Sequence, residues 1–101
     1  MTDREKIEVL VDEELKAANE NYPLFRSPHE AYAVMFEEVQ EMIESASNVK
    51  TQVLEMWSEV REDRNIEEEA ERINRYAVEV VQEAIQVAAM AKKVLMSELY
   101  K

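Results

Sequence analysis

Glutamates at short helical spacing are the residues of this chain most able to do chemistry. Two stretches gather oxygen-bearing side chains three or four residues apart: EEVQE, with Glu37, Glu38 and Glu41, and EVVQEAIQ, with Glu79, Glu83 and Gln86. Residues at that spacing are neighbours on a helix surface, where like charges repel each other weakly. A cation between them reverses the sign of that interaction. The two stretches are therefore candidate halves of one metal site.

The composition restricts such a site to oxygen ligands. Among the 101 residues there is no Cys and one His, which excludes thiolate zinc sites, a Cys nucleophile and His clusters. The absence of Gly excludes the phosphate-binding loops of P-loop and dinucleotide-binding proteins, whose backbone must approach phosphate closely. Carboxylates alone prefer hard ions, so we expect Mg²⁺ or Mn²⁺.

A solvated acidic surface is the other interpretation of the same residues. The chain carries 23 acidic residues, so pairs three apart arise readily without any function, as with Glu59 and Glu62 or Glu68 and Glu71. Spacing alone leaves both interpretations open.

The net charge of −11 disfavours binding to nucleic acid or to an anionic membrane surface. No stretch reaches the length of a membrane span, and the chain starts without an apolar signal segment. We therefore expect a soluble, cytoplasmic protein with neither nucleic-acid nor membrane partners.

Helix-forming residues and the lack of Gly predict an all-α protein, a bundle of about four helices. The first helix starts at a Thr2–Glu5 capping box and ends near Ala18. The second starts at Ser27, which caps it ahead of Pro28, and runs to a break or kink at SASN, residues 45–48. A shorter helix covers 49–60, and a long one covers about 66–99. EDRN, residues 62–65, is the joint between these two, which could also run on as one helix.

The long C-terminal helix predicts self-association. Its apolar positions span about 200° of the circumference, roughly twice what an ordinary surface helix needs. We therefore expect it to touch more than one neighbour, some of them from another copy in a homodimer or tetramer. The whole chain, 1–101, is then one domain, with an N-terminal helix and connector at 1–26 and the bundle core at 27–99.

The stretches HEAYAVMFEEVQEM and EVVQEAIQVAAMAKK resemble the small phage-type branch of the MazG-like, all-α nucleoside triphosphate pyrophosphohydrolases. The resemblance covers roughly residues 27–95 and rests on EExxE at Glu37, Glu38 and Glu41. It implies a helical dimer or tetramer that holds Mg²⁺ between two helices. It also implies hydrolysis of a nucleoside triphosphate to the monophosphate and pyrophosphate.

The second family motif, ExxD, differs in this chain. EAIQ stands in its place, with Glu83 matched and Gln86 where the family has Asp. An amide oxygen can bind Mg²⁺ but brings no charge. Glu59–Glu62 is an alternative second motif with a more family-like separation, although the chain after it is polar.

The resemblance implies a role for each candidate residue. Metal ligands would be Glu38, Glu41 and Glu83, with Glu79 and Gln86 as weaker ones. Glu37 or Glu41 would take the proton of the attacking water. Lys93 would bind phosphate. Alternatively, Lys93 would only be a cation near the C-terminal end of its helix, where the helix dipole favours positive charge. The competing functional hypothesis is a non-catalytic phage or prophage helical oligomer acting in protein–protein interaction.

Overall fold

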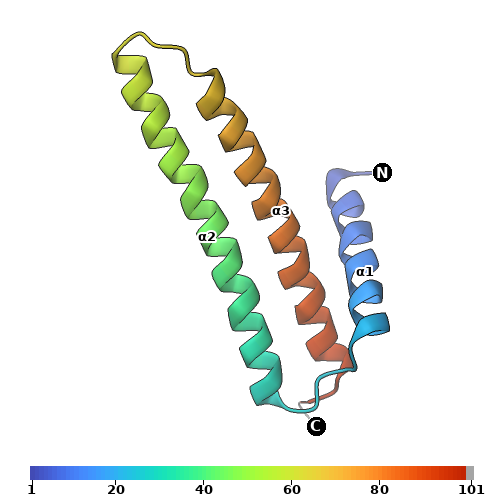
Figure 1. The fold of residues 1–101 in the computed structure, drawn as a ribbon. Coiled ribbons are helices and arrows are strands. Elements are labelled where there is room, and N and C mark those ends of the chain that lie inside the picture. Colours follow the sequence, from blue (N-terminus) through green and yellow to red (C-terminus); the bar gives the residue numbers. More distant parts are fainter. Residues whose placement is uncertain (100–101) are drawn as a thin grey trace.

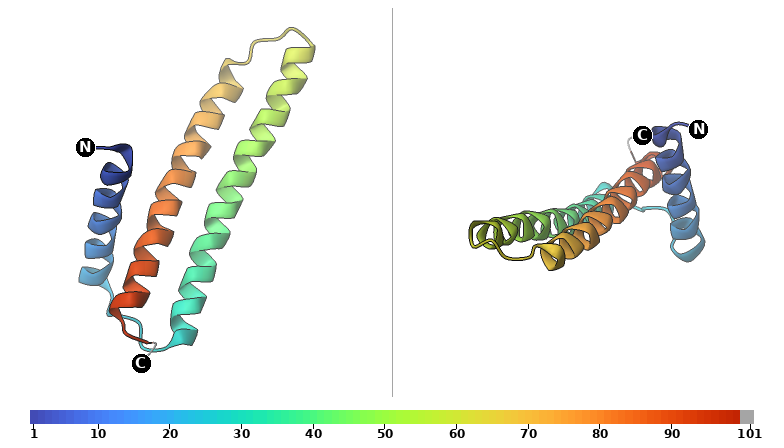
Figure 2. Two further views of the ribbon diagram at one scale, coloured as in Figure 1. Left: turned by 180° about the vertical axis from the view of Figure 1, so that it is seen from behind. Right: turned by 90° about the horizontal axis from the view of Figure 1, so that it is seen from above.

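The computed structural model describes residues 1–99 and contains three helices: α1 (Asp3–Asn21), α2 (Pro28–Arg61) and α3 (Glu67–Met96). The all-α prediction is confirmed, but the expected number of about four helices is wrong. The helices α2 and α3 run antiparallel side by side, and α1 lies against the C-terminal half of α3 (Figure 1). Seen from above, α1 crosses the α2–α3 pair at a steep angle (Figure 2). The middle helix α3 therefore contacts both of the others.

The two helix starts predicted from side-chain caps, at Thr2 and Ser27, are confirmed, whereas the start predicted at residue 49 is wrong because α2 runs through it. Thr2 and Glu5 form a reciprocal capping box, and the Ser27 hydroxyl accepts a hydrogen bond of 3.1 Å from the backbone N–H of Glu30. Each cap satisfies a backbone donor that the first turn of a helix leaves free. At the other end, α1 runs past Ala18 to Asn21 and stops where the residue before Pro23 adopts an extended conformation.

The predicted break at residues 45–48 is wrong, because α2 continues through them for 34 residues. Ser45 is buried, and its hydroxyl donates a hydrogen bond of 2.8 Å to Glu83 on α3. A serine whose hydroxyl bonds across to another helix does not compete for the backbone of its own helix. A tertiary contact therefore keeps the helix intact.

The chain reverses between α2 and α3 without glycine. Asp63 adopts a left-handed conformation with φ of 52°. The N–H of Arg64 donates to the carbonyl of Glu59 at 2.9 Å, and the N–H of Asp63 donates to that of Val60 at 3.1 Å. These two bonds satisfy carbonyls at the helix end in the pattern that usually has Gly at the left-handed position. The predicted joint at 62–65 is confirmed, and α2 and α3 are separate helices.

We expect Asp63→Gly to stabilise the protein by about 0.5–1 kcal/mol, since Gly takes the left-handed conformation without the steric cost of a Cβ. Urea denaturation followed by circular dichroism measures the change. Glu62→Gly is the matched control: Glu62 has a φ of −98°, so Gly gains nothing there and should lower stability. A loss of stability in Asp63→Gly would contradict the assignment of this turn.

A regular seam joins α2 to α3. Buried and half-buried positions alternate at steps of four and three on both helices, as in a coiled coil. On α2 these are Ala31, Met35, Glu38, Met42, Ser45, Val49, Gln52, Met56 and Glu59. On α3 they are Glu69, Ile73, Tyr76, Val80, Glu83, Val87, Met90 and Val94, and Ser97 continues the pattern at the cap of the helix. Helical spacing alone groups several apolar residues on one face of α2: Tyr32, Met35, Phe36, Val39, Met42, Ile43 and Ala46. The seam is instead rotated, so that Tyr32, Phe36 and Ile43 are exposed while Glu38 and Ser45 face α3.

The small buried core lies where α1, the connector and the lower parts of α2 and α3 meet. Its members are Val11, Phe25, Ala31, Ala89 and Met90. An ion pair of 2.6 Å between Lys92 and Asp12 fastens α1 to α3, and the backbone N–H of Phe25 donates to Ser97 at 2.9 Å. The prediction that the last helix touches more than one neighbour is confirmed, and both neighbours belong to the same chain. None of the described helices is long and apolar enough to cross a membrane.

Candidate functional site

A groove runs between α1 and α2, with α3 as its floor. Its volume is about 620 Å³. We call it the carboxylate groove, and it is lined by Glu14, Ala17, Ala18, Asn21, Tyr22, Pro23, Phe25, Arg26, Glu30, Val34, Glu37, Glu38, Gln86, Met90 and Lys93. A second pocket of about 520 Å³ adjoins it, since Glu14 and Gln86 line both, and this pocket adds Glu41 and Glu83. The two halves of the predicted site therefore meet at neighbouring pockets.

Glu38 is the most perturbed carboxyl group of this region. It lies in the α2–α3 seam, and its Oε2 atom is buried without a hydrogen-bond partner. Burial raises the pKa of Glu38 above its ordinary value, and four nearby carboxylates raise it further, in the order Glu41, Glu37, Glu14 and Glu83. All three helices thus contribute negative charge around one side chain.

Glu83 is the seam residue of α3 whose charge acts on Glu38 of α2. Its Oε1 atom accepts the hydrogen bond of 2.8 Å from Ser45, whereas its Oε2 atom is buried without a hydrogen-bond partner. A buried carboxylate oxygen without a donor or a cation is costly. Glu38 and Glu83 therefore each keep one buried carboxylate oxygen without a hydrogen-bond donor, and neither donates to the other.

The predicted ligands are brought near one another but do not form a finished coordination shell. Within residues 1–99, no three His, Asp or Glu side chains are placed so that they could hold one metal ion. The chemistry of the donors fits Mg²⁺, which binds carboxylate oxygens. Glu83 would have to exchange its bond with Ser45, or add to it, to take part. The residues therefore fit the ion in donor type, but within residues 1–99 their side chains are not arranged around one common point.

The other predicted site residues differ in how close they come to this centre. Glu37 is exposed and lines the carboxylate groove, and Glu41 is exposed at the adjoining pocket. Gln86 is half-buried between the two pockets. Glu79 lies one turn closer to the α2–α3 loop than Glu83, and it is half-buried. Glu79 is therefore the most peripheral of the predicted ligands.

Lys93 lines the carboxylate groove and lies in the last turn of α3. Its side chain is 3% exposed, and its Nζ atom sits 5.2 Å from the centre of the Phe25 ring. Contact with an aromatic face stabilises a partly desolvated ammonium group. The last turn of α3 also favours a cation there. Lys93 thus brings its amino group into the groove beside Phe25.

The alternative second motif, Glu59–Glu62, lies away from this region. Glu38 and Glu59 are 21 residues apart on the continuous helix α2, which separates them by about 30 Å. The hydrogen bond from Arg64, at 2.7 Å, lowers the pKa of Glu59. Glu59 therefore cannot share an ion with Glu38 of the same chain.

Two residues of the site were missed from the sequence. Glu14 is contributed by α1, a helix to which no chemistry was assigned, and Ser45 was taken as part of a helix break. Glu14 directly precedes Leu15, which packs against the core, so its position at the rim of an apolar face was a usable signal. That position alone does not show which other helix lies next to Glu14.

The raised pKa of Glu38 predicts a pH-dependent stability. Because the folded state holds the proton of Glu38 more tightly than the unfolded chain does, ionisation of Glu38 weakens the fold. That penalty is absent below the unfolded-state pKa and complete above the folded-state pKa. Without divalent ions, Glu38→Gln should therefore raise the melting temperature at pH 7.5, with the gain shrinking towards pH 4.

Thermal melts of both proteins in EDTA at the two pH values measure this difference. Glu44→Gln, which removes an exposed carboxylate of the same helix, should leave stability nearly unchanged. If Glu38→Gln were less stable than the wild type at pH 7.5, the strain assigned to Glu38 would be absent.

Fold and groove together define a small all-α protein of three helices with an acidic, lysine-containing groove. No protein-family model matches the chain, and no curated protein and no solved structure matches it.

Proposed function

We propose that this protein is a Mg²⁺-dependent nucleoside triphosphate pyrophosphohydrolase of the MazG-like type. The observation that carries the proposal is the pair of buried oxygens, Glu38 Oε2 and Glu83 Oε2, neither of which has a hydrogen-bond donor. They come from the two stretches that resemble the family motifs.

A divalent cation would offset the repulsion between the carboxylates around Glu38. Five carboxylates lie close enough for four of them to raise the pKa of the fifth, Glu38. Like charges held together in a partly desolvated site destabilise a fold unless a counter-charge joins them. Their oxygens are ligands of the kind that Mg²⁺ selects.

The chain's own residues divide the remaining work. Glu38, Glu41 and Glu83 would hold the ion, with Gln86 and Glu79 as neutral and peripheral helpers. When bound, Mg²⁺ would supply Lewis-acid polarisation of a phosphate oxygen. Glu37, which is exposed at the groove, would accept a proton from water, and Lys93, which lines the same groove, would bind phosphate oxygens.

The dimensions of the carboxylate groove suit a nucleotide. A volume of about 620 Å³ falls within the usual range of small-molecule sites. Its wall combines the apolar side chains of Phe25, Val34 and Met90 with charged side chains, and Lys93 Nζ lies 5.2 Å from the centre of the Phe25 ring. A nucleotide, which joins a flat base to charged phosphates, would use both kinds of contact.

A panel of nucleoside triphosphates assayed for pyrophosphate release, with and without Mg²⁺, tests the proposal. We expect Mg²⁺-dependent release from at least one of them. Melting curves provide a second readout, since Mg²⁺ or Mn²⁺ should stabilise the wild type by binding the folded state alone. No release from any nucleotide, together with no metal-dependent stabilisation, would contradict it.

The second candidate is a non-catalytic helical oligomer that acts in protein–protein interaction. It is favoured by the large apolar side chains that α2 exposes, among them Tyr32, Ile43 and Trp57. It becomes the better proposal if both metal experiments are negative.

A further inference from the structure

One aromatic side chain of the carboxylate groove is left uncovered by the rest of the chain. Among the described residues, the aromatic ones that line this groove are Tyr22 and Phe25. Phe25 is 7% exposed, and the Nζ atom of Lys93 lies 5.2 Å from the centre of its ring. Tyr22 is 69% exposed, and no residue within 1–99 makes a hydrogen bond or a ring contact with its side chain. Tyr22 is therefore the aromatic ring that a flat ligand in the groove can reach.

The backbone around Tyr22 is held in place, although its side chain is not. The N–H of Tyr22 donates to the carbonyl of Ala18 at 2.9 Å. Pro23 follows and favours the extended conformation that Tyr22 adopts, with φ of −138° and ψ of 145°. Further along the connector, the N–H of Phe25 donates to Ser97 of the α3 cap at 2.9 Å. Because the backbone is fixed on both sides, a ligand that contacts the ring does not have to order the connector as well.

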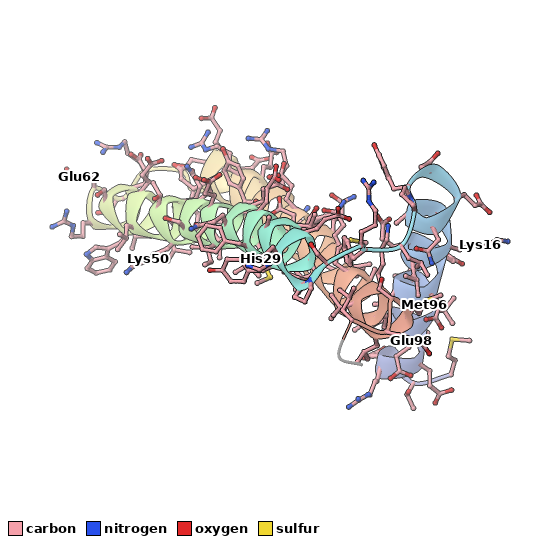
Figure 3. All side chains as sticks on the ribbon, turned by 90° about the horizontal axis from the view of Figure 1, so that it is seen from below. Lys16, His29, Lys50, Glu62, Met96 and Glu98 are labelled. Atoms are coloured by element: carbon pink, nitrogen blue, oxygen red, sulfur yellow. The ribbon has the colours of Figure 1, made fainter. Side chains whose placement is uncertain are left out.

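The three helices give the carboxylate groove two distinct ends. Its lining positions follow one another at steps of three or four on each helix, and α1 and α3 run in one direction while α2 runs in the other (Figure 1). The lining residues at the first end include Glu14, Glu38 and Gln86, and those at the second end include Tyr22, Glu30 and Lys93. The connector from the end of α1 to the start of α2, near His29, lies at the second end (Figure 3). We call this second end the connector end.

The two ends differ in charge. Glu14, Glu37 and Glu38 bring carboxylates from two helices to the first end. Among the described residues, the cations that line the groove are Arg26 and Lys93, and both belong to the connector end. Phosphate is repelled by carboxylates unless a cation lies between them, and it is attracted by an ammonium group.

This distribution of charge orients a nucleotide in the groove. The ion and the carboxylates that hold it would occupy the first end. Lys93 lies seven residues after Gln86 on α3, which is about 10 Å along the helix. A nucleotide whose phosphates contact both the ion and Lys93 therefore has its base at the connector end, where Tyr22 is exposed.

We infer that Tyr22 stacks on the base of the bound nucleotide, so that the groove prefers nucleotides to inorganic polyphosphate. The inference rests on the proposed function, since it takes a Mg²⁺-bound nucleotide as the ligand. It adds to the site a residue of the connector, outside both glutamate stretches. Every nucleobase has a flat face that can stack on an aromatic ring, so this contact favours nucleotides without selecting one base.

Isothermal titration calorimetry with two ligands, each in the presence of Mg²⁺, tests the inference. The first ligand is a nucleoside triphosphate analogue with a methylene group between the α and β phosphorus atoms, which blocks hydrolysis at that position. The second is inorganic tripolyphosphate, which has the phosphates and no base. We expect the wild type to bind the analogue more tightly. Tyr22→Ala should weaken binding of the analogue at least about fivefold and leave binding of tripolyphosphate unchanged.

Two further variants separate stacking from a general effect on the groove. Tyr22→Phe keeps the ring and should bind both ligands as the wild type does. Tyr32→Ala is the matched control, because Tyr32 is also 69% exposed but lies outside the lining of the carboxylate groove. Its ring is stacked with that of Phe36, with 6.0 Å between the ring centres. Tyr32→Ala should change the binding of neither ligand.

The possible outcomes distinguish this inference from the proposed function. Unchanged binding of the analogue by Tyr22→Ala, or an equal loss for both ligands, would overturn the role of Tyr22 and leave the proposed function standing. A wild type that binds tripolyphosphate as tightly as the analogue would do the same, since the base would then contribute nothing. A wild type that binds neither ligand would contradict the proposed function, and the role of Tyr22 with it.

Discussion

Glu38→Gln should lower Mg²⁺-dependent pyrophosphate release at least about a hundredfold, equivalent to roughly 2.7 kcal/mol of transition-state stabilisation. The carboxylate of Glu38 is the proposed ligand that the protein itself compensates least, since burial and four neighbouring carboxylates raise its pKa. The amide keeps the shape of the side chain and removes the charge that would hold the ion. Steady-state kinetics with the best nucleotide, at a fixed excess of Mg²⁺, measure the loss.

Several variants separate this result from unfolding and from the alternative motif. Glu83→Gln should cause a loss of similar size. Glu59→Gln should keep full activity, because Glu59 lies about 30 Å from Glu38 along α2 and is paired with Arg64. In the absence of metal, Glu38→Gln is expected to be at least as stable as the wild type, so its inactivity could not come from a damaged fold. Full activity in Glu38→Gln, or a loss confined to Glu59→Gln, would refute the assigned site.

Ala89→Leu should destabilise the protein by about 1–3 kcal/mol, the largest stability change we expect from a single conservative substitution. Ala89 has no exposed surface and belongs to the buried cluster that includes Val11 of α1. Added methylenes there have no space, so they would push the helices apart. Urea denaturation measures the change, and hydrogen exchange would show whether protection is lost in α1 first.

Ala17→Leu is the control for this substitution, because it makes the same change at an exposed position of α1. Its effect should stay within about 0.5 kcal/mol. If both variants were equally stable, α1 would not be packed closely against α3 at Ala89. The pairing of Asp12 with Lys92 would then be the main contact that holds α1 in place.

Local signals in the sequence predicted the two capped helix starts and one of the two breaks correctly. The Thr2 and Ser27 caps depend on residues within four positions of one another, so no tertiary contact is needed to specify them. The SASN stretch failed as a break for the opposite reason. Ser45 could form its hydrogen bond locally or across a helix interface, and only the presence of Glu83 opposite decides between these.

The sequence by itself determined the all-α class, the oxygen-only chemistry of any metal site and the pairs of glutamates that lie on one helix surface. Composition and short-range spacing settle such matters, because they follow from bond geometry and side-chain type. Only the tertiary structure decided which of those glutamates face one another. The rotation of α2 about its axis is a collective outcome of packing along the whole seam, and it buries Glu38 while leaving Tyr32 and Ile43 exposed. The contribution of Glu14 likewise depends on how α1 crosses α3, a contact between parts of the chain about 70 residues apart that no local pattern encodes.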